Sequence, residues 1–131
     1  MKEKEGLFYG GNSDQNRQII ENKKTKFLVL NHSDNKRDSL YERDSGLNQV
    51  LCKIAKQKGV SFIINLEELK NTEGKMRAET LARIIQNIML INKFGNKTKI
   101  IYPKNWESRN VQSFLLTIGS STNLAKNSTA N

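Results

Sequence analysis

Residues 47–66 read LNQVLCKIAKQKGVSFIINL and join one expected helix to one expected strand. The first half places apolar residues with spacings of three, one, three and one, the stripe of a helix packed on a core: Leu47, Val50, Leu51, Ile54 and Ala55. Gly59 favours the end of that helix. Residues 60–66 are then apolar on both faces, which is typical of a parallel strand covered by helices. The stretch therefore predicts a helix that leads into a buried strand of a parallel sheet.

The same alternation runs along most of the chain. Strands are expected at residues 7–9, 27–30, 60–66 and 99–102, and helices at 13–23, 45–58, 76–94 and 108–118. Expected helix caps are Ser13, either Asp44 or Ser45, and Ser108. This order predicts an α/β fold with a parallel sheet, either open or half of an eight-unit barrel. We expect one domain over residues 1–119 and a disordered polar tail over 120–131.

Charge is the clearest compositional signal. The chain has 131 residues, with 22 Lys plus Arg against 13 Asp plus Glu and a formal charge of +9. This balance favours a polyanionic partner such as nucleic acid, although it is also compatible with a role in solubility alone. Cys52 is the single cysteine, so no intrachain disulfide can form, and its helical position predicts a buried core residue. No apolar run approaches the roughly 20 residues of a membrane helix, and we expect a cytoplasmic protein.

Few residues are suited to catalysis at the carboxyl ends of the predicted strands, where α/β folds bind ligands. A metal hydrolase needs several histidine and acidic ligands, whereas this chain has a single histidine, His32. A lone histidine is more often a structural residue than a catalytic one. The adjacent Glu67 and Glu68 are interpreted as a solvated pair. The turn at Gly10–Gly11 precedes a helix and could hold a phosphate, but it lacks the rest of a nucleotide-binding motif. The pattern therefore gives no support to metal catalysis.

The longest predicted helix carries an unusual cation. Leu81, Ile84, Ile85 and Ile88 form its expected core stripe, and Arg77 falls on the same face in the first turn. Two explanations stay open for Arg77: an internal ion pair with a carboxylate such as Asp44 or Glu67, or contact with an RNA phosphate. The same helical count predicts that four side chains face outward: Arg83, Gln86, Asn87 and Leu90.

Several segments together resemble the ribonuclease P protein component 3 family. Residues 43–51 read RDSGLNQVL and residues 77–87 read RAETLARIIQN, and both are similar to helix segments of that family. Weaker similarities lie at residues 9–12, 16–17, 30–33 and 109–119. The positions that carry the resemblance are Gly10, Gly11, Asn16, His32, Asp44, Ser45, Gly46, Asn48, Arg83 and Asn87.

The resemblance implies a TIM-barrel-like fold, related to metal-dependent phosphoesterases of the PHP type but without their metal cluster. It implies a non-catalytic protein subunit of the endoribonuclease complex that removes the 5′ leader of precursor tRNA. The RNA subunit would carry out the Mg²⁺-assisted hydrolysis, and the protein would bind no cofactor. Implied partners are the ribonuclease P RNA, precursor tRNA and a small ferredoxin-like protein subunit.

In this framework we expect basic side chains at the carboxyl edge of the sheet to neutralise RNA phosphates. The candidates are Arg17, Lys36, Arg37, Arg43, Lys75, Arg77, Lys104 and Arg109. Family members have about three more βα units before the first strand found here, so an incomplete barrel is expected, closed by a homodimer or a separately encoded N-terminal half. A histidine expected near Gln49 is absent, and residues 102–105 depart from a Ser-Gly-Ala-like step. Two alternatives remain: a small PHP-like phosphoesterase with a degenerate metal site, and a basic α/β RNA-binding or interaction module.

Overall fold

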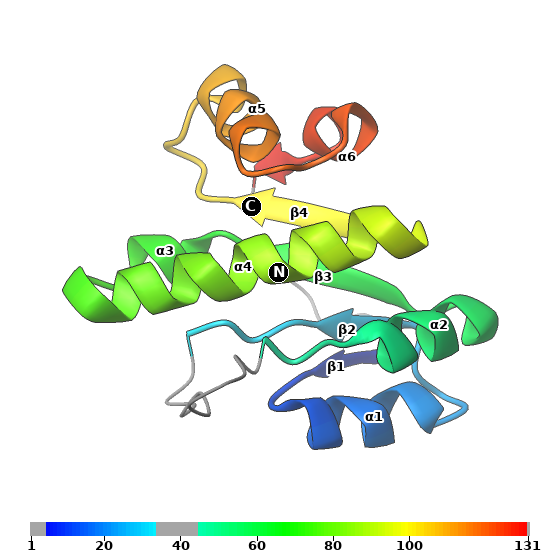
Figure 1. Cartoon of the computed structure of the whole chain (residues 1–131). Helices are drawn as coiled ribbons and strands as arrows, with labels where there is room; N and C mark the ends of the chain where they lie inside the picture. Colours follow the sequence, from blue (N-terminus) through cyan, green and yellow to red (C-terminus); the bar gives the residue numbers. More distant parts are fainter. Residues whose placement is uncertain (1–4, 34–44, 131) are drawn as a thin grey trace.

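Five parallel strands form the centre of the structure, a computed structural model that describes residues 5–33 and 45–130 (Figure 1). They are β1 (Leu7–Tyr9), β2 (Phe27–Val29), β3 (Ser61–Asn65), β4 (Thr98–Tyr102) and β5 (Thr129–Ala130). Their order in the sheet is their order in the chain, and each neighbouring pair is parallel. The predicted parallel α/β fold is confirmed. A sheet wound in one direction, without a reversal of strand order, is the arrangement found in barrels rather than in doubly wound sheets.

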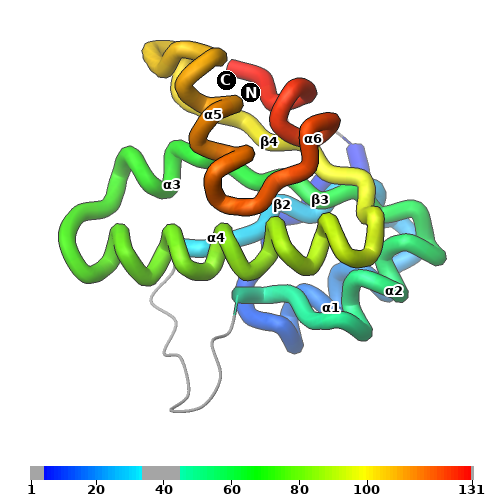
Figure 2. Tube along the Cα trace, turned by 45° about the horizontal axis from the view of Figure 1, so that its top comes forward, coloured from blue at the N-terminus to red at the C-terminus, as the bar shows by residue number. Residues whose placement is uncertain are grey.

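Helices connect successive strands. They are α1 (Ser13–Glu21), α2 (Gln49–Lys58), α3 (Glu67–Lys70), α4 (Gly74–Phe94), α5 (Ser108–Thr117) and α6 (Thr122–Lys126). Helix α4 lies across the sheet, with α2 beside it and with α5 and α6 near β4 (Figures 1 and 2). On the helix-covered face, the strand side chains of Leu28, Phe62, Ile64 and Ile100 are fully buried. They form one core with Ile84 and Ile88 of α4 and Leu115 of α5.

The opposite face of the sheet is less covered. Register places Tyr9, Val29 and Ile63 side by side on this face. Ile63 is buried and Val29 is half-buried, whereas Tyr9 is 62% exposed. In a closed α/β barrel this face would look into the barrel interior. The two faces therefore differ in burial, although strand alternation gives both of them apolar side chains.

The start of α2 differs from the prediction. Asn48 is the N-cap, because its side chain accepts a hydrogen bond from the Leu51 N–H at 2.9 Å. Ser45 is buried three residues earlier, and Asp44 lies outside the described residues. Val50, which was expected on the buried stripe, is 53% exposed. Cys52 is buried in the core, as predicted, and burial raises the pKa of its thiol to about 11.

Two other predicted caps were one residue off. Asn12, rather than Ser13, caps α1 through a capping box in which its side chain accepts from the Gln15 N–H. Glu107, rather than Ser108, occupies the N-cap position of α5. Neighbouring polar residues are equivalent in a sequence pattern, and only the backbone conformation selects between them.

Residues 120–130 include a short helix and a short strand, which corrects the prediction of a disordered polar tail for this part of residues 120–131. Helix α6 is capped by Ser121, and its Leu124 and Ala125 are buried in the core. Strand β5 then pairs with β4 through Ile101 and Thr129. Elements this short show no periodicity, so tertiary contacts decide their structure. In the described parts of the chain, none of the helices is long and apolar enough to span a membrane.

Candidate functional site

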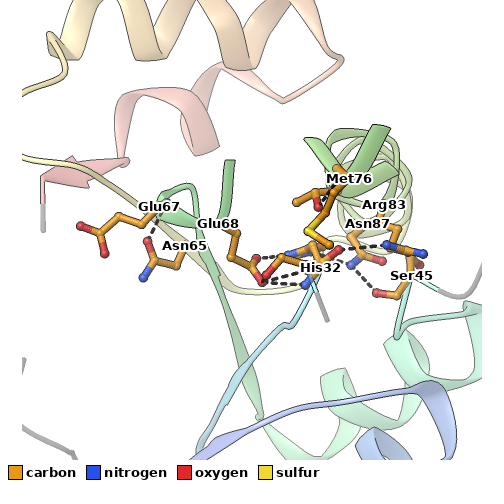
Figure 3. Close-up of polar contacts among 10 residues, drawn as sticks. His32, Ser45, Asn65, Glu67, Glu68, Met76, Arg83 and Asn87 are labelled. Carbon is orange, nitrogen blue, oxygen red and sulfur yellow. Dashed lines mark hydrogen bonds and ion pairs between the residues drawn. The ribbon is translucent and has the colours of Figure 1, made fainter. Parts of the chain in front are cut away.

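A buried polar network occupies the carboxyl edge of the sheet, and His32 lies at its centre (Figure 3). His32 follows β2 and is completely buried. Its Nδ1 lies 2.7 Å from Oε2 of Glu68 in α3, and its backbone N–H donates to Oε1 of the same carboxylate at 2.8 Å. One carboxylate from α3 therefore binds both the ring and the backbone N–H of His32.

Helix α4 holds His32 from the other side. The Asn87 Nδ2 group lies 2.9 Å from His32 Nε2 and donates to the Ser45 carbonyl at 2.8 Å. Because the amide donates to Nε2, this arrangement favours the tautomer with the proton on Nδ1, directed at Glu68. The Arg83 Nη1 group also donates to the His32 carbonyl at 3.2 Å. The network thus joins α4 to the residues after β2 and before α2.

The Glu68 carboxylate is stabilised in its charged form. Burial by itself would raise the pKa of Glu68, but hydrogen bonds and the charge interaction with His32 lower it further than burial raises it. Ser33 adds a backbone and a hydroxyl hydrogen bond to Oε1, at 3.2 and 3.1 Å. The net result is a pKa below the ordinary value of 4.5. Glu68 is therefore an acceptor built into the fold and not a proton donor near neutral pH.

A second network surrounds Asn16 in α1. Its Oδ1 accepts from the Gly11 N–H at 2.9 Å, and its Nδ2 donates to the Gly46 carbonyl at 2.8 Å. Gly10 allows this approach, because a Cβ atom there would lie 2.4 Å from Asn16 Oδ1 and 3.1 Å from the Val29 carbonyl oxygen. Asn16 therefore fixes the turn after β1 against the segment that leads into α2.

These networks place most of the family-motif positions at the carboxyl edge. The motif residues in hydrogen bonds with one another, or adjacent to them in the chain, are Gly10, Gly11, Asn16, His32, Ser45, Gly46, Arg83 and Asn87. Asn48 caps α2, and Asp44 lies outside the described residues. The described motif side chains bond mainly to the protein's own backbone and side chains. Their arrangement is that of a scaffold.

Three predictions about polar side chains were wrong. Arg83 and Asn87 were expected to face outward, but they are 2% and 0% exposed. A helical count assumes that the buried face of a helix packs against apolar residues. This part of α4 instead packs against His32 and Ser45. Glu68 was interpreted as a solvated carboxylate, but its side chain is 17% exposed and accepts four hydrogen bonds. The four-residue spacing of Arg83 and Asn87, which puts both on one helix face, was the available signal.

A small pocket adjoins the network. It has a volume of about 240 Å³ and is lined by residues at the ends of β1, β2 and β3: Tyr9, Gly10, Val29, Leu30, Asn31, Ser33, Asn65 and Glu68. Its one carboxylate is already hydrogen-bonded to His32 and Ser33. Within residues 5–33 and 45–130, no three side chains of the His, Cys, Asp or Glu type gather to hold a metal ion. The pocket therefore has the polarity of a binding site but not a pair of carboxylates for acid–base chemistry.

The described members of the predicted RNA-binding set lie in three separate segments of the chain. Arg17 lies on α1 and pairs with Glu21 at 2.8 Å, and Lys75 lies in the first turn of α4, 3.9 Å from Glu79. Lys104 and Arg109 are exposed near the start of α5. The Arg77 side chain donates from Nε to the carbonyls of Leu69 and Thr72, at 3.1 and 2.7 Å, which the sequence pattern does not reveal. The remaining candidates, Lys36, Arg37 and Arg43, lie outside the described residues.

The relatives found by sequence comparison share the same protein name. Ribonuclease P protein component 3 of Methanosarcina acetivorans is 34% identical over 88 residues, which make up 67% of this chain and 34% of that protein. The protein of the same name from Methanosarcina mazei is 33% identical over the same shares of each chain. This chain thus spans about a third of the length of the curated relatives that it matches. No protein-family model matches it.

Comparison with solved structures agrees with the sequence comparison. A chain in the cryo-EM structure of archaeal ribonuclease P with mature tRNA matches with a TM-score of 0.68 and 27% sequence identity. The match covers 92% of this chain and 51% of that chain. Sequence and fold therefore confirm the predicted resemblance to the ribonuclease P protein component 3 family.

Proposed function

We propose that this chain acts as a protein subunit, or part of one, in ribonuclease P and supports the RNA-catalysed removal of the 5′ leader from precursor tRNA. The observation that carries the proposal is the similarity in sequence and fold to ribonuclease P protein component 3. The carboxyl edge is consistent with a non-catalytic role, because its motif side chains are engaged in internal hydrogen bonds. Under this proposal Mg²⁺ acts at the RNA subunit, and the protein binds no cofactor.

The proposed partners are the ribonuclease P RNA, precursor tRNA and a ferredoxin-like protein subunit. The predicted basic residues would contribute phosphate contacts from the carboxyl edge, chiefly Lys75, Lys104 and Arg109, whose side chains are exposed. The less covered face of the sheet provides a site for a further chain. A second copy or a separately encoded segment would cover Tyr9, Val29 and their neighbours and complete the core.

Light scattering on the purified chain tests that part of the proposal. We expect a dimer when the chain is alone, or a heteromer when the covering segment is supplied. A stable monomer that ignores added partners would contradict it.

Cleavage of precursor tRNA tests the function itself. The reaction contains reconstituted ribonuclease P RNA and the ferredoxin-like partner at low Mg²⁺, with or without this chain. We expect the chain to raise the cleavage rate, and only when the RNA subunit is present. Absence of stimulation would contradict the proposal. Metal-dependent cleavage by the protein without the RNA subunit would instead indicate a phosphoesterase.

A further inference from the structure

The opposite, amino edge of the sheet carries a cluster of lysines that the motifs do not include. We define the amino-edge lysine cluster as Lys26, Lys53, Lys56, Lys58, Lys93 and Lys97, all of them exposed. Lys26 and Lys97 directly precede β2 and β4, and their carbonyls accept from the N–H groups of Ser61 and Phe62, each at 2.9 Å. The other four lie on α2 and near the end of α4, which return to this edge after crossing the sheet (Figure 1).

Three of these ammonium groups converge on Phe94, the last residue of α4. Lys53 and Lys93 lie over its ring, with Nζ at 5.8 and 5.6 Å from the centroid. The Lys56 Nζ group donates to the Phe94 carbonyl at 3.0 Å. Like charges gathered around one residue repel one another unless an anion lies near them.

No carboxylate in the described parts of the chain forms an ion pair with any lysine of the cluster. Glu21 is nearby, but its carboxylate pairs with Arg17, and the Lys58 Nζ group donates to the Glu21 backbone carbonyl at 2.9 Å. The cluster therefore contains cations that the described protein does not neutralise.

The charge of the described residues is unevenly distributed between the edges. With the flanking Lys23, Lys24, Lys99 and Lys126, the amino edge holds ten lysines against two acidic residues, Glu5 and Glu21. The rest of the described chain holds seven basic and six acidic residues. Most of the net positive charge of the described part therefore lies on the edge that carries none of the family-motif positions.

Helix geometry explains part of this distribution. Lys56, Lys58 and Lys93 lie in the last turns of α2 and α4, where a cation interacts favourably with the helix dipole. Lys26 and Lys97 are at strand starts and gain nothing from a helix end. Since β2 and β4 are two strand spacings apart, roughly 10 Å, the cluster is wider than a single anion. Its dimensions fit a polyanion.

We propose that the amino-edge lysine cluster binds the sugar–phosphate backbone of RNA, which makes it a second and stronger RNA contact than the predicted carboxyl edge. This inference rests on the proposed function for its choice of RNA as the polyanion. Lysine ammonium groups act as point charges that neutralise phosphates without reading bases. Tyr9, an exposed aromatic residue, lies at the other edge. The Phe94 ring is partly buried against the core, with Lys53 and Lys93 over it, so the contact that we propose is with phosphates rather than with stacked bases.

Salt dependence of RNA binding by two matched variants tests the inference. One variant removes the convergent charges (Lys53→Gln, Lys56→Gln, Lys93→Gln), and the control removes three carboxyl-edge charges (Lys75→Gln, Lys104→Gln, Arg109→Gln). Each lowers the formal charge by the same amount. Fluorescence anisotropy on the full chain, with labelled ribonuclease P RNA and precursor tRNA, gives the slope of log affinity against log salt concentration. We expect the first variant to flatten that slope by about two to three and the control to flatten it by less.

A third variant, Lys53→Arg/Lys56→Arg/Lys93→Arg, keeps the charge and should keep the slope, which separates charge from folding. An amino-edge variant with the wild-type slope would overturn the inference, as would a control with the larger effect. Failure of the wild-type chain to bind either RNA would also overturn it. Stimulation of precursor tRNA cleavage by the wild-type chain is measured in parallel. If stimulation occurs while the amino-edge variant binds normally, the proposed function stands and only the inference fails.

Discussion

The two edges of one parallel sheet use polar residues in opposite ways. At the carboxyl edge, His32 and Asn87 are fully buried, and the His32 ring is hydrogen-bonded to both Asn87 and the partly buried Glu68. At the amino edge, lysines such as Lys26 and Lys97 are exposed and have no ion-pair partner among the described carboxylates. The edge that carries the motif thus maintains the fold, and the edge without it presents the charge.

Burial explains why these two edges are constrained differently. A buried polar group without a partner costs far more than a hydrogen bond contributes, so each member of the His32 network depends on the others. An exposed lysine can change to another cation at little cost. A motif is therefore expected to mark the network even where the network contacts no ligand.

The largest expected effect is from breaking that network at its centre. His32→Ala removes the ring that is hydrogen-bonded to both Glu68 and Asn87 and leaves a void in a fully buried position. We expect a loss of about 2–4 kcal/mol in the free energy of unfolding, measured by urea denaturation. The matched surface variant Lys75→Ala should change it by less than about 0.5 kcal/mol. Equal values for the two variants would mean that the network does not stabilise the fold.

Asn16→Ala is expected to have the next largest effect. It leaves the Gly11 N–H and the Gly46 carbonyl without their side-chain partner, and we expect a loss of about 1–3 kcal/mol. Gln57→Ala, at an exposed position of α2, is the control. Urea denaturation of both variants gives the loss in the free energy of unfolding. If the loss for Asn16→Ala is as small as that for the control, the Asn16 network does not stabilise the fold, and only the His32 network does.

The smallest expected effect is a dependence of stability on pH at the carboxyl edge. Because the folded-state pKa of Glu68 lies below its ordinary value of 4.5, the charged carboxylate contributes stability at higher pH. That contribution is lost as the pH falls from about 4.5 through the lower folded-state pKa. The stability difference between the wild type and Glu68→Gln should therefore shrink over this acidic range in a series of urea titrations. A difference that is constant with pH would show that the charge of Glu68 has no role.

The sequence predicted four of the five described strands because their signals are strong and local. The apolar run at residues 60–66 and the stripe around Leu51 and Ala55 each have the period of the element that they form. Parallel pairing then followed from the alternation of strands and helices.

The polar part of the site was not predictable in the same way. Arg83 and Asn87 are buried because α4 packs against the residues just after β2 and just before α2, which supply the His32 and Ser45 carbonyls, and a helical count carries no information about those neighbours. Helix α6 escaped prediction because its burial involves only Leu124 and Ala125. The amino-edge cluster was missed because its lysines come from separate segments that become neighbours only in the folded sheet.

Lysine footprinting with and without ribonuclease P RNA would test most directly whether the two edges differ in function. The full chain is acetylated briefly, and mass spectrometry gives the modification at each lysine. RNA should protect Lys53, Lys56 and Lys93 while Lys75 and Lys104 remain reactive. Protection confined to Lys75 and Lys104 would contradict the account and would place the RNA at the carboxyl edge.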